Sequence, residues 1–510
     1  MNHSFEISHD PHPSSLPIAS MAATDLVAAF RARALSPVEV LRVLMERIEA
    51  VDRAGPAINS ILRLSEDALG EAKKAESAYL KQADFGRLLG VPILLKDNID
   101  TEDLDTTAGS LAFRNMPRPR RDAEVTRRLR DAGAIIFGKT NLSEWSNMRG
   151  SRSSSGWSAV GGQTKNPHAL DRSPGGSSSG SGAAVAAMLS PLALGSETDG
   201  SINCPASVCG VVGMKPTVGR VSRRGVIPIS STQDSVGPLT RSVADARLLL
   251  DVISGLDTED PATIDYHKGI QPIRSQRSPR VGALARAASD FSPNHLRLYN
   301  ETLTTLRNGG FHVISEVDDS DEYELKLSDS DSMRVLISEL SDTLENYLAD
   351  RGAPDADSIK AIVDFNRSNS RDEMLFYGQD HFEAALQSFG ISSDEYRVSF
   401  ESNRKLARQG IDSILQRHDL DAIVAPSMAP AWLIDQVLGD RYVPECYSYA
   451  AVAGYPSMTI PMGAIFGLPV GLLIFGTAGS EDLLLDIADQ IEAHLNYSGI
   501  VSFTSSTQIH

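Results

Sequence analysis

The chain has 510 residues, of which 41% are hydrophobic and 22% charged, and its formal net charge is −18. This length can hold one large domain or roughly two to three ordinary ones. No apolar run reaches the roughly 18 residues of a membrane-spanning helix, and the acidic balance argues against nucleic-acid binding. The cysteines, Cys204, Cys209 and Cys446, form no CxxC motif, so neither a disulfide framework nor a zinc site is expected.

The N-terminal part predicts a short arm followed by helices. Residues 1–20 lack the basic region and the apolar stretch of a secretory signal, so we expect a poorly ordered arm and a cytoplasmic protein. Residues 22–53 predict two helices, and the second begins at the capping box Ser36-Pro37-Val38-Glu39. A strand within residues 57–64 and a charged helix over residues 65–80 are expected next.

Residues 88–95 form a buried apolar run that ends at Lys96-Asp97-Asn98. Ligands of α/β proteins usually bind at the carboxyl end of such a strand, which makes this triplet a candidate site. A helix is predicted over residues 122–132 and a strand over residues 134–137. Residues 133–140 match the phosphate-binding pattern GxxxxGK(S/T), but a strand does not turn its amides toward phosphate, so phosphate binding is not expected.

Residues 171–201 are the part of the chain richest in small residues and hydroxyls. A Gly/Ser loop over residues 174–182 is typical of a linker, but the wholly apolar segment 183–189 that follows predicts a buried helix. The apolar run 192–194 then leads into a second polar turn over residues 195–201. Two serine-bearing turns at the ends of one buried helix and strand indicate a nucleophilic site.

The rest of the chain alternates predicted strands and helices, which places the fold in the α/β class. Residues 208–236 predict short strands and tight turns, residues 260–280 a linker or surface crossing, and residues 315–420 mostly polar helices. The acidic stretch 316–331 is expected to be a solvated surface segment. Further strands are expected at residues 279–284, 422–426, 457–460 and 470–475, and further helices at residues 241–256, 292–308 and 481–495.

A serine nucleophile needs a base, and two kinds are available. Residues 176–180 fit the GxSxG elbow with Ser178 as nucleophile, but the segment before them is a poor strand. Lysine is the alternative when burial lowers its pKa, and Lys96, Lys139 and Lys215 all follow or lie within apolar sequence. The residue pattern alone does not choose among them. The histidines that could complete a Ser–His–Asp triad lie in polar contexts: His267, His295, His312, His381, His418 and His494.

Seven motifs occur in order along the chain. They are residues 96–98 (KDN), 138–141 (GKTN), 175–181 (GGSSSGS), 195–202 (GSETDGSI), 209–217 (CGVVGMKPT), 234–238 (DSVGP) and 467–471 (GLPVG). With this set the chain resembles the amidase signature family over most of its length. The resemblance implies an α/β fold with a central mixed, twisted β-sheet flanked by helices on both faces. It also implies one domain over residues 21–500, made of a helical part (21–85), a catalytic core (about 86–260), a more variable substrate-side segment (about 265–445) and a core-completing part (446–500).

The same resemblance implies a Ser–cis-Ser–Lys arrangement. Ser201 would be the nucleophile, Ser177 would bridge after a cis Gly176–Ser177 peptide bond, and Lys96 would be the base. The proton of Ser201 would pass through Ser177 to neutral Lys96, since a hydroxyl can donate and accept a hydrogen bond at once.

The resemblance also implies how substrate is held. Backbone N–H groups of Thr198, Asp199 and Gly200 would stabilise the oxyanion. We expect a small-molecule or peptide amide as partner, no metal, cofactor, nucleic acid or membrane, and a monomer or homodimer. The candidates for the substrate pocket are Asn98, Ser178, Asn203 and Gln233.

Two departures from the family's pattern narrow the substrate. Many members carry TGGS at the nucleophile and an arginine two residues after it, whereas this chain has Asp199 and Asn203. The missing arginine weakens the case for a substrate anchored by a free carboxylate, including glutamine. The ETDGS form, with residues 233–235 (QDS) and 453–457 (AGYPS), is most similar to bacterial peptide amidases, which release ammonia from C-terminally amidated peptides. Asp199 either caps its turn or contacts substrate.

The leading expectation is therefore an amide hydrolase that acts on peptide amides or similar uncharged amides. An aryl or fatty-acyl amidase would use the same catalytic residues and differ only in its pocket, which is expected to draw on residues 315–450. The catalytic component of an amidotransferase complex would feed ammonia to a partner and carry an exposed apolar docking surface. A non-catalytic binding protein is disfavoured by the intact Lys96, Ser177 and Ser201.

Overall fold

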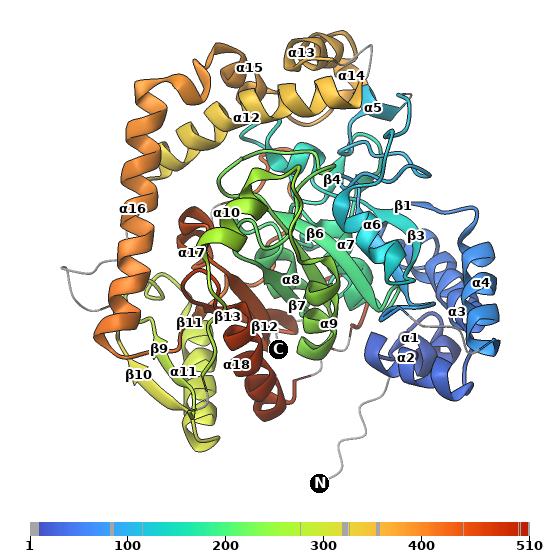
Figure 1. Ribbon diagram of the computed structural model, residues 1–510, viewed down its shortest axis with the longest axis horizontal. Helices are drawn as coiled ribbons and strands as arrows, with labels where there is room; N and C mark the ends of the chain where they lie inside the picture. Colours follow the sequence, from blue (N-terminus) through green and yellow to red (C-terminus); the bar gives the residue numbers. More distant parts are fainter. Residues whose placement is uncertain are drawn as a thin grey trace.

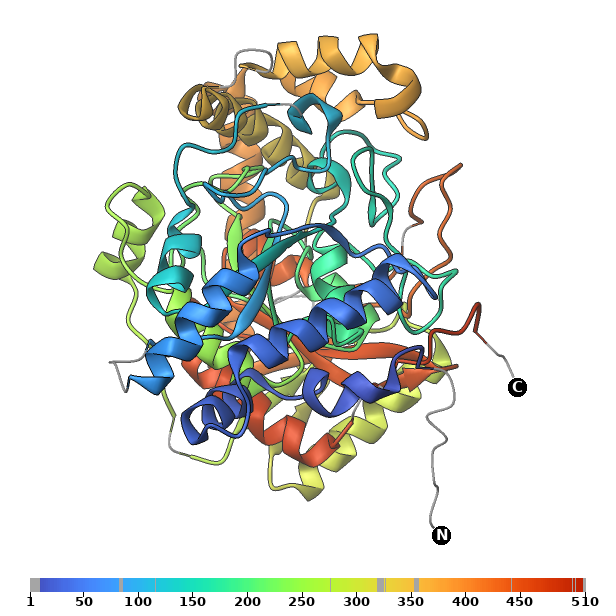
Figure 2. The same cartoon turned by 90° about the vertical axis from the view of Figure 1, so that its right-hand side faces the viewer.

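One mixed β-sheet forms the centre of the computed structural model, which describes residues 10–81, 86–114, 116–275, 277–318, 325, 327–352, 357–441, 443–497, 499 and 501–507. In this part of the chain the sheet has 11 strands in the order β1-β3-β2-β6-β8-β7-β12-β13-β11-β9-β10. Helices cover both faces (Figure 1 and Figure 2), which confirms the expected fold class. The strands are β1 (Ile61–Leu64), β2 (Pro92–Lys96), β3 (Ile135–Thr140), β6 (Leu192–Glu197), β7 (Val212–Lys215), β8 (Ser235–Thr240), β9 (Arg280–Ala283), β10 (His312–Ser315), β11 (Ala422–Pro426), β12 (Ser457–Ile465) and β13 (Leu468–Phe475).

The two faces of the sheet contact separate hydrophobic clusters. Successive side chains of a strand point to opposite faces, so Ile93 and Leu95 of β2 join one cluster and Leu94 joins the other. Residues of α9 (Val243–Ile253) belong to the first cluster and residues of α7 (Ser179–Ala186) to the second. Because both faces are covered, every residue of β2 is buried, as its continuous apolar sequence predicted.

Parallel pairing brings two of the sequence motifs to one edge of the sheet. β2 pairs in parallel with β6, with Leu95 opposite Leu194, and β6 continues antiparallel to β8. β2 ends at Lys96 and β6 ends at Glu197, so the lysine and the second serine-bearing turn both follow the carboxyl ends of neighbouring strands. That edge is where α/β proteins usually bind ligands.

Most predicted elements are confirmed with small shifts at their ends. The residues that match a phosphate loop lie in β3, which pairs with β1 and β2, so they have the extended backbone expected of them. Ser36 caps its helix by accepting a hydrogen bond from the Glu39 amide. The helices on the sheet include α2 (Ala23–Ala32), α3 (Pro37–Arg47), α4 (Ala68–Leu80), α6 (Glu124–Asp131), α8 (Asn203–Cys209), α11 (Pro293–Asn308), α17 (Ser448–Ala453) and α18 (Glu481–Leu495).

The segment predicted to hold mostly polar helices forms a helical frame. In Figure 1 α12, α13 and α15 lie along the top of the view and α16 runs down its left side. Leu340 and Leu344 of α12 and Phe382 of α15 share a hydrophobic cluster with Trp145, which attaches the frame to the core. The helices are α12 (Asp329–Arg351), α13 (Ile359–Ser368), α14 (Ser370–Glu373), α15 (Asp380–Gln387) and α16 (Asp394–Arg417).

The serine-rich window differs from its prediction at two places. The expected loop over residues 174–182 ends early, because α7 already begins at Ser179. A Cβ at Gly180 would lie 2.3 Å from the Ser60 carbonyl oxygen, so the glycine lets this helix approach the neighbouring backbone. The expected turn over residues 195–201 is shorter as well: residues 195–197 pair with β8, and only residues 198–201 turn.

Two expectations for the second half of the chain also differ from the structure. Residues 260–280 include a helix, α10 (Pro261–Gly269), which Asp260 caps by accepting a hydrogen bond from the Ala262 amide. The acidic stretch 316–331 is not uniformly solvated: Asp318 is buried and accepts the Ala285 and Ala287 amides, whereas residues 319–324 and 326 lie outside the described residues.

The expected N-terminal arm also differs where it is described. Residues 13–19 form two short helical segments, η1 (Pro13–Ser15) and α1 (Leu16–Ala19), and Asp10 pairs with the fully buried Arg47 at 2.8 Å. Residues 1–9 lie outside the described part. No helix within the described ranges is long and apolar enough to cross a membrane.

Candidate active site

Lys96 ends β2 and is fully buried. Its Nζ donates to Ser177 Oγ at 2.7 Å, to Ser196 Oγ at 3.0 Å and to the Ser196 carbonyl oxygen at 3.4 Å. Burial lowers the pKa of Lys96 to about 7, against the opposing effect of Asp234 and Glu197. Near neutral pH a substantial fraction of this lysine is uncharged and able to accept a proton.

The two other candidate lysines have structural partners instead. Lys139 Nζ lies 3.4 Å from Asp97 Oδ1 and donates to the Ile99 carbonyl at 2.7 Å. Lys215 donates to the Tyr455 carbonyl at 2.9 Å, and burial lowers its pKa to about 8. Among the described contacts neither lysine reaches a serine hydroxyl, so Lys96 is the one placed to exchange a proton with the serine-rich loop.

The two serine-bearing turns meet beside Lys96. The Gly176–Ser177 peptide bond is cis, as the resemblance implied, and Ser177 is fully buried. The Ser178 amide donates to the Ser201 carbonyl at 3.1 Å, which joins the first turn to the second. Ser201 lines an open cleft, whereas Ser177 is fully buried and accepts the hydrogen bond from Lys96.

The turn that carries Ser201 is held by the carboxylate of Glu197. Glu197 accepts the Ile202 amide at 2.7 Å and the Asn203 amide at 2.8 Å, which pairs the N-terminus of α8 with a negative charge. Gly200 has a φ of +78°, and a Cβ there would lie 2.2 Å from the Tyr447 ring, so only glycine fits this position. The turn is therefore closely constrained on both sides of Ser201.

The backbone of the same turn leaves donors available. Thr198 is fixed through its side chain to Asp234, and its carbonyl accepts Gln233 Nε2 at 3.2 Å. No hydrogen bond from the N–H groups of Thr198, Asp199 or Gly200 to another described residue is present. Amides arranged in this way can donate to an anionic oxygen beside Ser201.

Asp199 faces the cleft rather than capping its own turn. Its Oδ1 accepts Ser448 Oγ at 2.6 Å, and the Ser448 amide donates to Glu445 Oε2 at 3.1 Å. Burial and the nearby Glu445 raise the pKa of Asp199 to about 8. Asp199, Glu445 and Ser448 all line the cleft, and among the described residues no backbone amide of its own turn donates to the Asp199 side chain.

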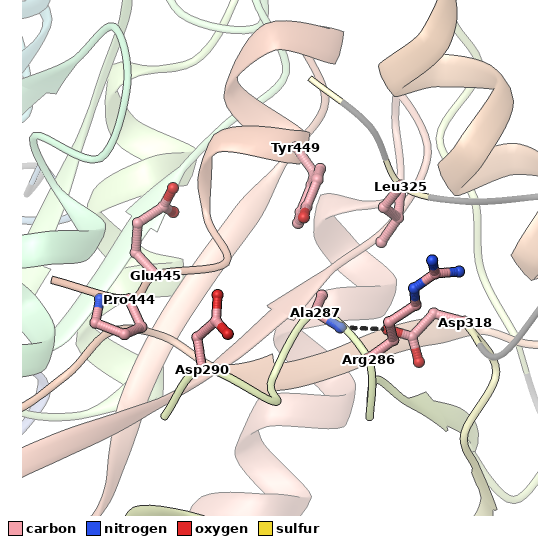
Figure 3. Close-up of a pocket in the computed structure, with 8 residues that line it drawn as sticks. All are labelled: Arg286, Ala287, Asp290, Asp318, Leu325, Pro444, Glu445 and Tyr449. Carbon is pink, nitrogen blue, oxygen red and sulfur yellow. Dashed lines mark hydrogen bonds between the residues drawn. The ribbon is translucent and has the colours of Figure 1, made fainter. Parts of the chain in front are cut away.

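A cleft of about 430 Å³ opens above Ser201. Its walls come from residues 146–155, the turn 198–201, α12 and α15, and residues 428–448. Ile229, Trp432 and Val443 supply part of its apolar surface. A second hollow of about 220 Å³, drawn in Figure 3, shares Glu445 with the cleft and is otherwise lined by Arg286, Ala287, Asp290, Asp318, Leu325, Pro444 and Tyr449.

The four predicted pocket residues lie beneath the cleft instead of lining it. Asn203 donates to both Glu197 oxygens and to Ser457 Oγ at 3.0 Å, and it accepts Thr459 Oγ1 at 2.9 Å, so its amide is fully used. Ser178 Oγ bonds the Ser196 backbone. Gln233 supports Thr198, as described above. Their polar residue types indicated a site, but the sequence does not show which polar side chains are consumed by internal hydrogen bonds.

Asn98 is the fourth of these residues. Its Nδ2 donates to Ser196 Oγ at 2.9 Å, so Asn98 and Lys96 share one hydroxyl partner. It borders a small cavity of about 20 Å³ that adjoins the cleft through Ser146 and Thr198. Sequence reasoning missed the residues that do line the cleft, among them Ser146, Asn147 and Asp440, because they lie on loops without a motif.

The described residues give less support to a nucleophile elbow at Ser178, to a histidine base and to a metal site. Ser178 is not at a nucleophile elbow, because no strand leads into α7 and its hydroxyl is buried against Ser196. Of the candidate histidines only His381 lines the cleft, and no described histidine is hydrogen-bonded to Ser177, Ser178 or Ser201. No cluster of three or more potential metal ligands occurs within the described ranges.

The chain is similar to known proteins over nearly its whole length. The chain is 42% identical to the native peptide amidase from Stenotrophomonas maltophilia and matches its crystal structure with a TM-score of 0.89, covering 96% of this chain and 99% of that chain. It is 35% identical over 485 residues to a probable amidase of Arabidopsis thaliana, covering 94% of this chain and 91% of the relative. It is 33% identical to a glutamyl-tRNA(Gln) amidotransferase subunit of Moorella thermoacetica, covering 94% and 97% of the two chains.

The fold and these matches define an amide-hydrolysing enzyme. Residues 39–485 match the family model described as Amidase. The chain belongs to the amidase family, as its ordered motifs implied.

Proposed function

We propose that the enzyme hydrolyses carboxamides through an acyl-enzyme on Ser201, with Ser177 relaying the proton to Lys96. The observation that carries this proposal is the 2.7 Å hydrogen bond from Lys96 Nζ to Ser177 Oγ at a fully buried site. A pKa of about 7 leaves enough neutral lysine to act as a base at neutral pH.

Acylation begins when Ser201 Oγ attacks the carbonyl carbon of the amide. The proton of Ser201 passes to Ser177, whose own proton passes to Nζ of Lys96. The lysine ammonium returns its proton through the Ser177 hydroxyl to the leaving nitrogen, so that ammonia departs and an ester on Ser201 remains. Water then attacks the ester and gives up a proton through Ser177 to Lys96, and that proton returns through Ser177 to Ser201 Oγ as the carboxylic acid leaves.

The negative oxygen of the tetrahedral intermediate is held by the amides of Thr198, Asp199 and Gly200. Two observations support this role for the three amides. They have no acceptor among the described residues, and the Tyr447 ring constrains Gly200. Donors that are fixed before the reaction stabilise the developing charge without reorganising, which favours the transition state over the bound substrate.

The substrate we propose is a C-terminally amidated peptide or a similar uncharged amide. Likeness to the Stenotrophomonas maltophilia peptide amidase supports this class. The cleft supports it as well. Arg441 is the only lysine or arginine among the described residues that line the cleft, and its side chain lies exposed near Asp435, so no buried cation is available to a free carboxylate next to the scissile bond.

A second candidate is the ammonia-supplying component of an amidotransferase complex. The observation in its favour is the 33% identity to the amidotransferase relative over nearly the whole chain. Glutamine carries a carboxylate and an ammonium group, and Asn203 cannot serve as an anchor for the carboxylate because its amide is fully bonded within the protein. This candidate therefore ranks second.

The test is ammonia release from an amidated dipeptide, measured beside an acyl-anilide and free glutamine. We expect the dipeptide amide to give the highest kcat/KM and Ser201→Ala to give none. Preferred turnover of the anilide would assign an aryl amidase, and preferred turnover of glutamine would assign an ammonia-supplying role in an amidotransferase. Undiminished ammonia release by Ser201→Ala would contradict the assignment of Ser201 as the nucleophile.

A further inference from the structure

One wall of the cleft contains an unusual stretch of backbone. Trp145, Ser146 and Asn147 have φ values of 50°, 53° and 70°, so three consecutive non-glycine residues are left-handed. L-residues seldom adopt this region, and consecutive ones are rarer still. Ser146 and Asn147 both line the cleft. Such backbone persists only where its surroundings hold it, and it concentrates at ligand-binding sites.

Aromatic packing fixes the first residue of this left-handed turn. The Trp145 amide donates to the Ala108 carbonyl at 2.9 Å. Its ring centroid lies 5.2 Å from that of Phe113 and 5.3 Å from that of Phe382 on α15. The turn is thereby attached both to the core and to the helical frame.

A buried ion pair fixes the residues that flank the turn. Glu144 and Arg149 are both fully buried and pair with each other across residues 145–148. Arg149 also donates to the carbonyls of Tyr377 at 3.1 Å and Gly378 at 3.3 Å, just before α15. Several buried interactions therefore hold Asn147 at one place on the cleft wall.

Asn147 and His381, which line the same cleft, have polar atoms without partners. Asn147 Oδ1 and His381 Nδ1 are shielded from solvent, and no other described residue bonds to either. His381 belongs to the same wall, because Asp380 Oδ1 accepts the Ser151 amide at 3.1 Å and Phe382 packs on Trp145. A buried acceptor left unpaired costs free energy, so this pair favours a ligand that brings a donor.

The missing group is a hydrogen-bond donor. Asn147 Oδ1 is an acceptor, and burial lowers the pKa of His381, so its imidazole is neutral and keeps one acceptor nitrogen. A peptide supplies backbone N–H donors at regular spacing before its terminal carboxamide. An aryl or fatty-acyl amide has no N–H other than those of the scissile group.

Resting on the proposed function, we propose that Asn147, with His381 beside it, forms a subsite for the peptide backbone. Asn147 Oδ1 accepts a hydrogen bond from an N–H of the peptide group that precedes the scissile carboxamide. The subsite makes the enzyme prefer peptide amides to carboxamides of similar size that lack a peptide bond.

The test compares three carboxamides: an N-acetylated dipeptide amide, its analogue methylated at the nitrogen of the peptide bond, and 3-phenylpropanamide. Asn147→Gly removes the side chain while tolerating the left-handed backbone, and Asn147→Asp keeps an acceptor oxygen in a residue that also tolerates it. For the dipeptide amide we expect Asn147→Gly to lower kcat/KM about tenfold, mainly through KM. For 3-phenylpropanamide we expect a change of less than about threefold.

Methylation should lower kcat/KM about tenfold in the wild type and have little effect in Asn147→Gly, whereas Asn147→Asp should retain most of the preference. Equal losses on all three substrates, or a wild-type enzyme indifferent to methylation, would overturn the subsite. Failure of the proposed function has a different signature, since the wild type would then turn over none of the three or Ser201→Ala would remain active.

Discussion

Beneath the cleft, hydrogen bonds between the segments that carry the sequence motifs use most of their polar side chains, although Asn98 Oδ1 is buried without a described partner. Asn203 engages Glu197, Ser457 and Thr459, and Ser178 bonds the backbone of β6. On the cleft wall, Asn147 and His381 keep buried atoms without a described partner at positions that line the cleft itself. The comparison separates residues that position the chemistry from residues that are able to receive a ligand.

The two regions also differ in where they come from. The layer beneath the cleft is built from β2, β6, α7 and α8, which are central and fully packed. The cleft wall is assembled from loops and from the helical frame, which are far apart in the sequence. Changes in the first region should affect rate or stability for every substrate, and changes in the second should affect the choice among substrates.

The largest effect is expected for Ser201→Ala. Removal of the proposed nucleophile should lower kcat for every amide by at least about 10⁴-fold, while the thermal unfolding midpoint stays close to that of the wild type. Initial rates of ammonia release and a calorimetric scan measure the two quantities. Ser77→Ala, at an exposed serine of α4, is the matched control and should behave as wild type. Substantial residual turnover would move the nucleophile to another hydroxyl.

The second-largest loss of activity is expected for Lys96→Met. We expect kcat to fall about 10²- to 10⁴-fold on all substrates alike, because the proton relay loses its base while the stem of the side chain still fills its space. Lys215→Met is the control, since Lys215 is equally buried but bonded to the Tyr455 carbonyl. Per folded molecule, it should keep activity within about threefold of wild type. If the two variants lost equal activity, the base assignment would fail.

The pH dependence of kcat/KM tests the assignment of Lys96 as the base. Since Lys96 must be neutral and its pKa is about 7, kcat/KM should rise through that pH and level off above it. Asp234 favours the ammonium form, so Asp234→Asn should lower this pKa and move the rising limb to lower pH by up to about one unit. A shift toward higher pH would contradict the proposed role of Lys96.

The smallest effect on catalysis is expected for Asn203→Ala. The change leaves the buried Glu197 and Thr459 short of partners and should lower the free energy of unfolding by about 1–3 kcal/mol. Denaturant titration measures that loss. The ratio of kcat/KM between dipeptide amide and 3-phenylpropanamide should stay unchanged, in contrast to Asn147→Gly. A changed ratio would mean that Asn203 contacts substrate after all.

Local patterns predicted much of the layer beneath the cleft. The apolar run before Lys96 predicted a buried strand, and the apolar residues 183–189 predicted a buried helix, because burial on all sides leaves a continuous apolar sequence. The start of that helix was misplaced, since Ser179 and Gly180 belong to it only where a close neighbouring backbone excludes larger residues.

The cleft wall was largely unpredictable for a physical reason. Its residues have ordinary polar loop sequences, and their meaning arises from contacts between distant segments, such as Trp145 with Phe382. Asn203 shows the same limit for a residue that does belong to a motif. Its position suggested a substrate contact, but a partner on β12, 254 residues away in the chain, consumes its amide. Hydrogen-bond saturation is a tertiary property and leaves no trace in composition.

The hydrogen bond between Lys96 and Ser177 spans 81 residues of chain, and Lys96 ends β2, which pairs in parallel with the distant β6. Pairings this distant form slowly during folding, because the intervening loop must close before any contact stabilises it. Recovery of hydrolysis after dilution from denaturant should therefore lag behind recovery of helical signal. In this enzyme the rate at which activity returns would report the rate at which the central sheet assembles.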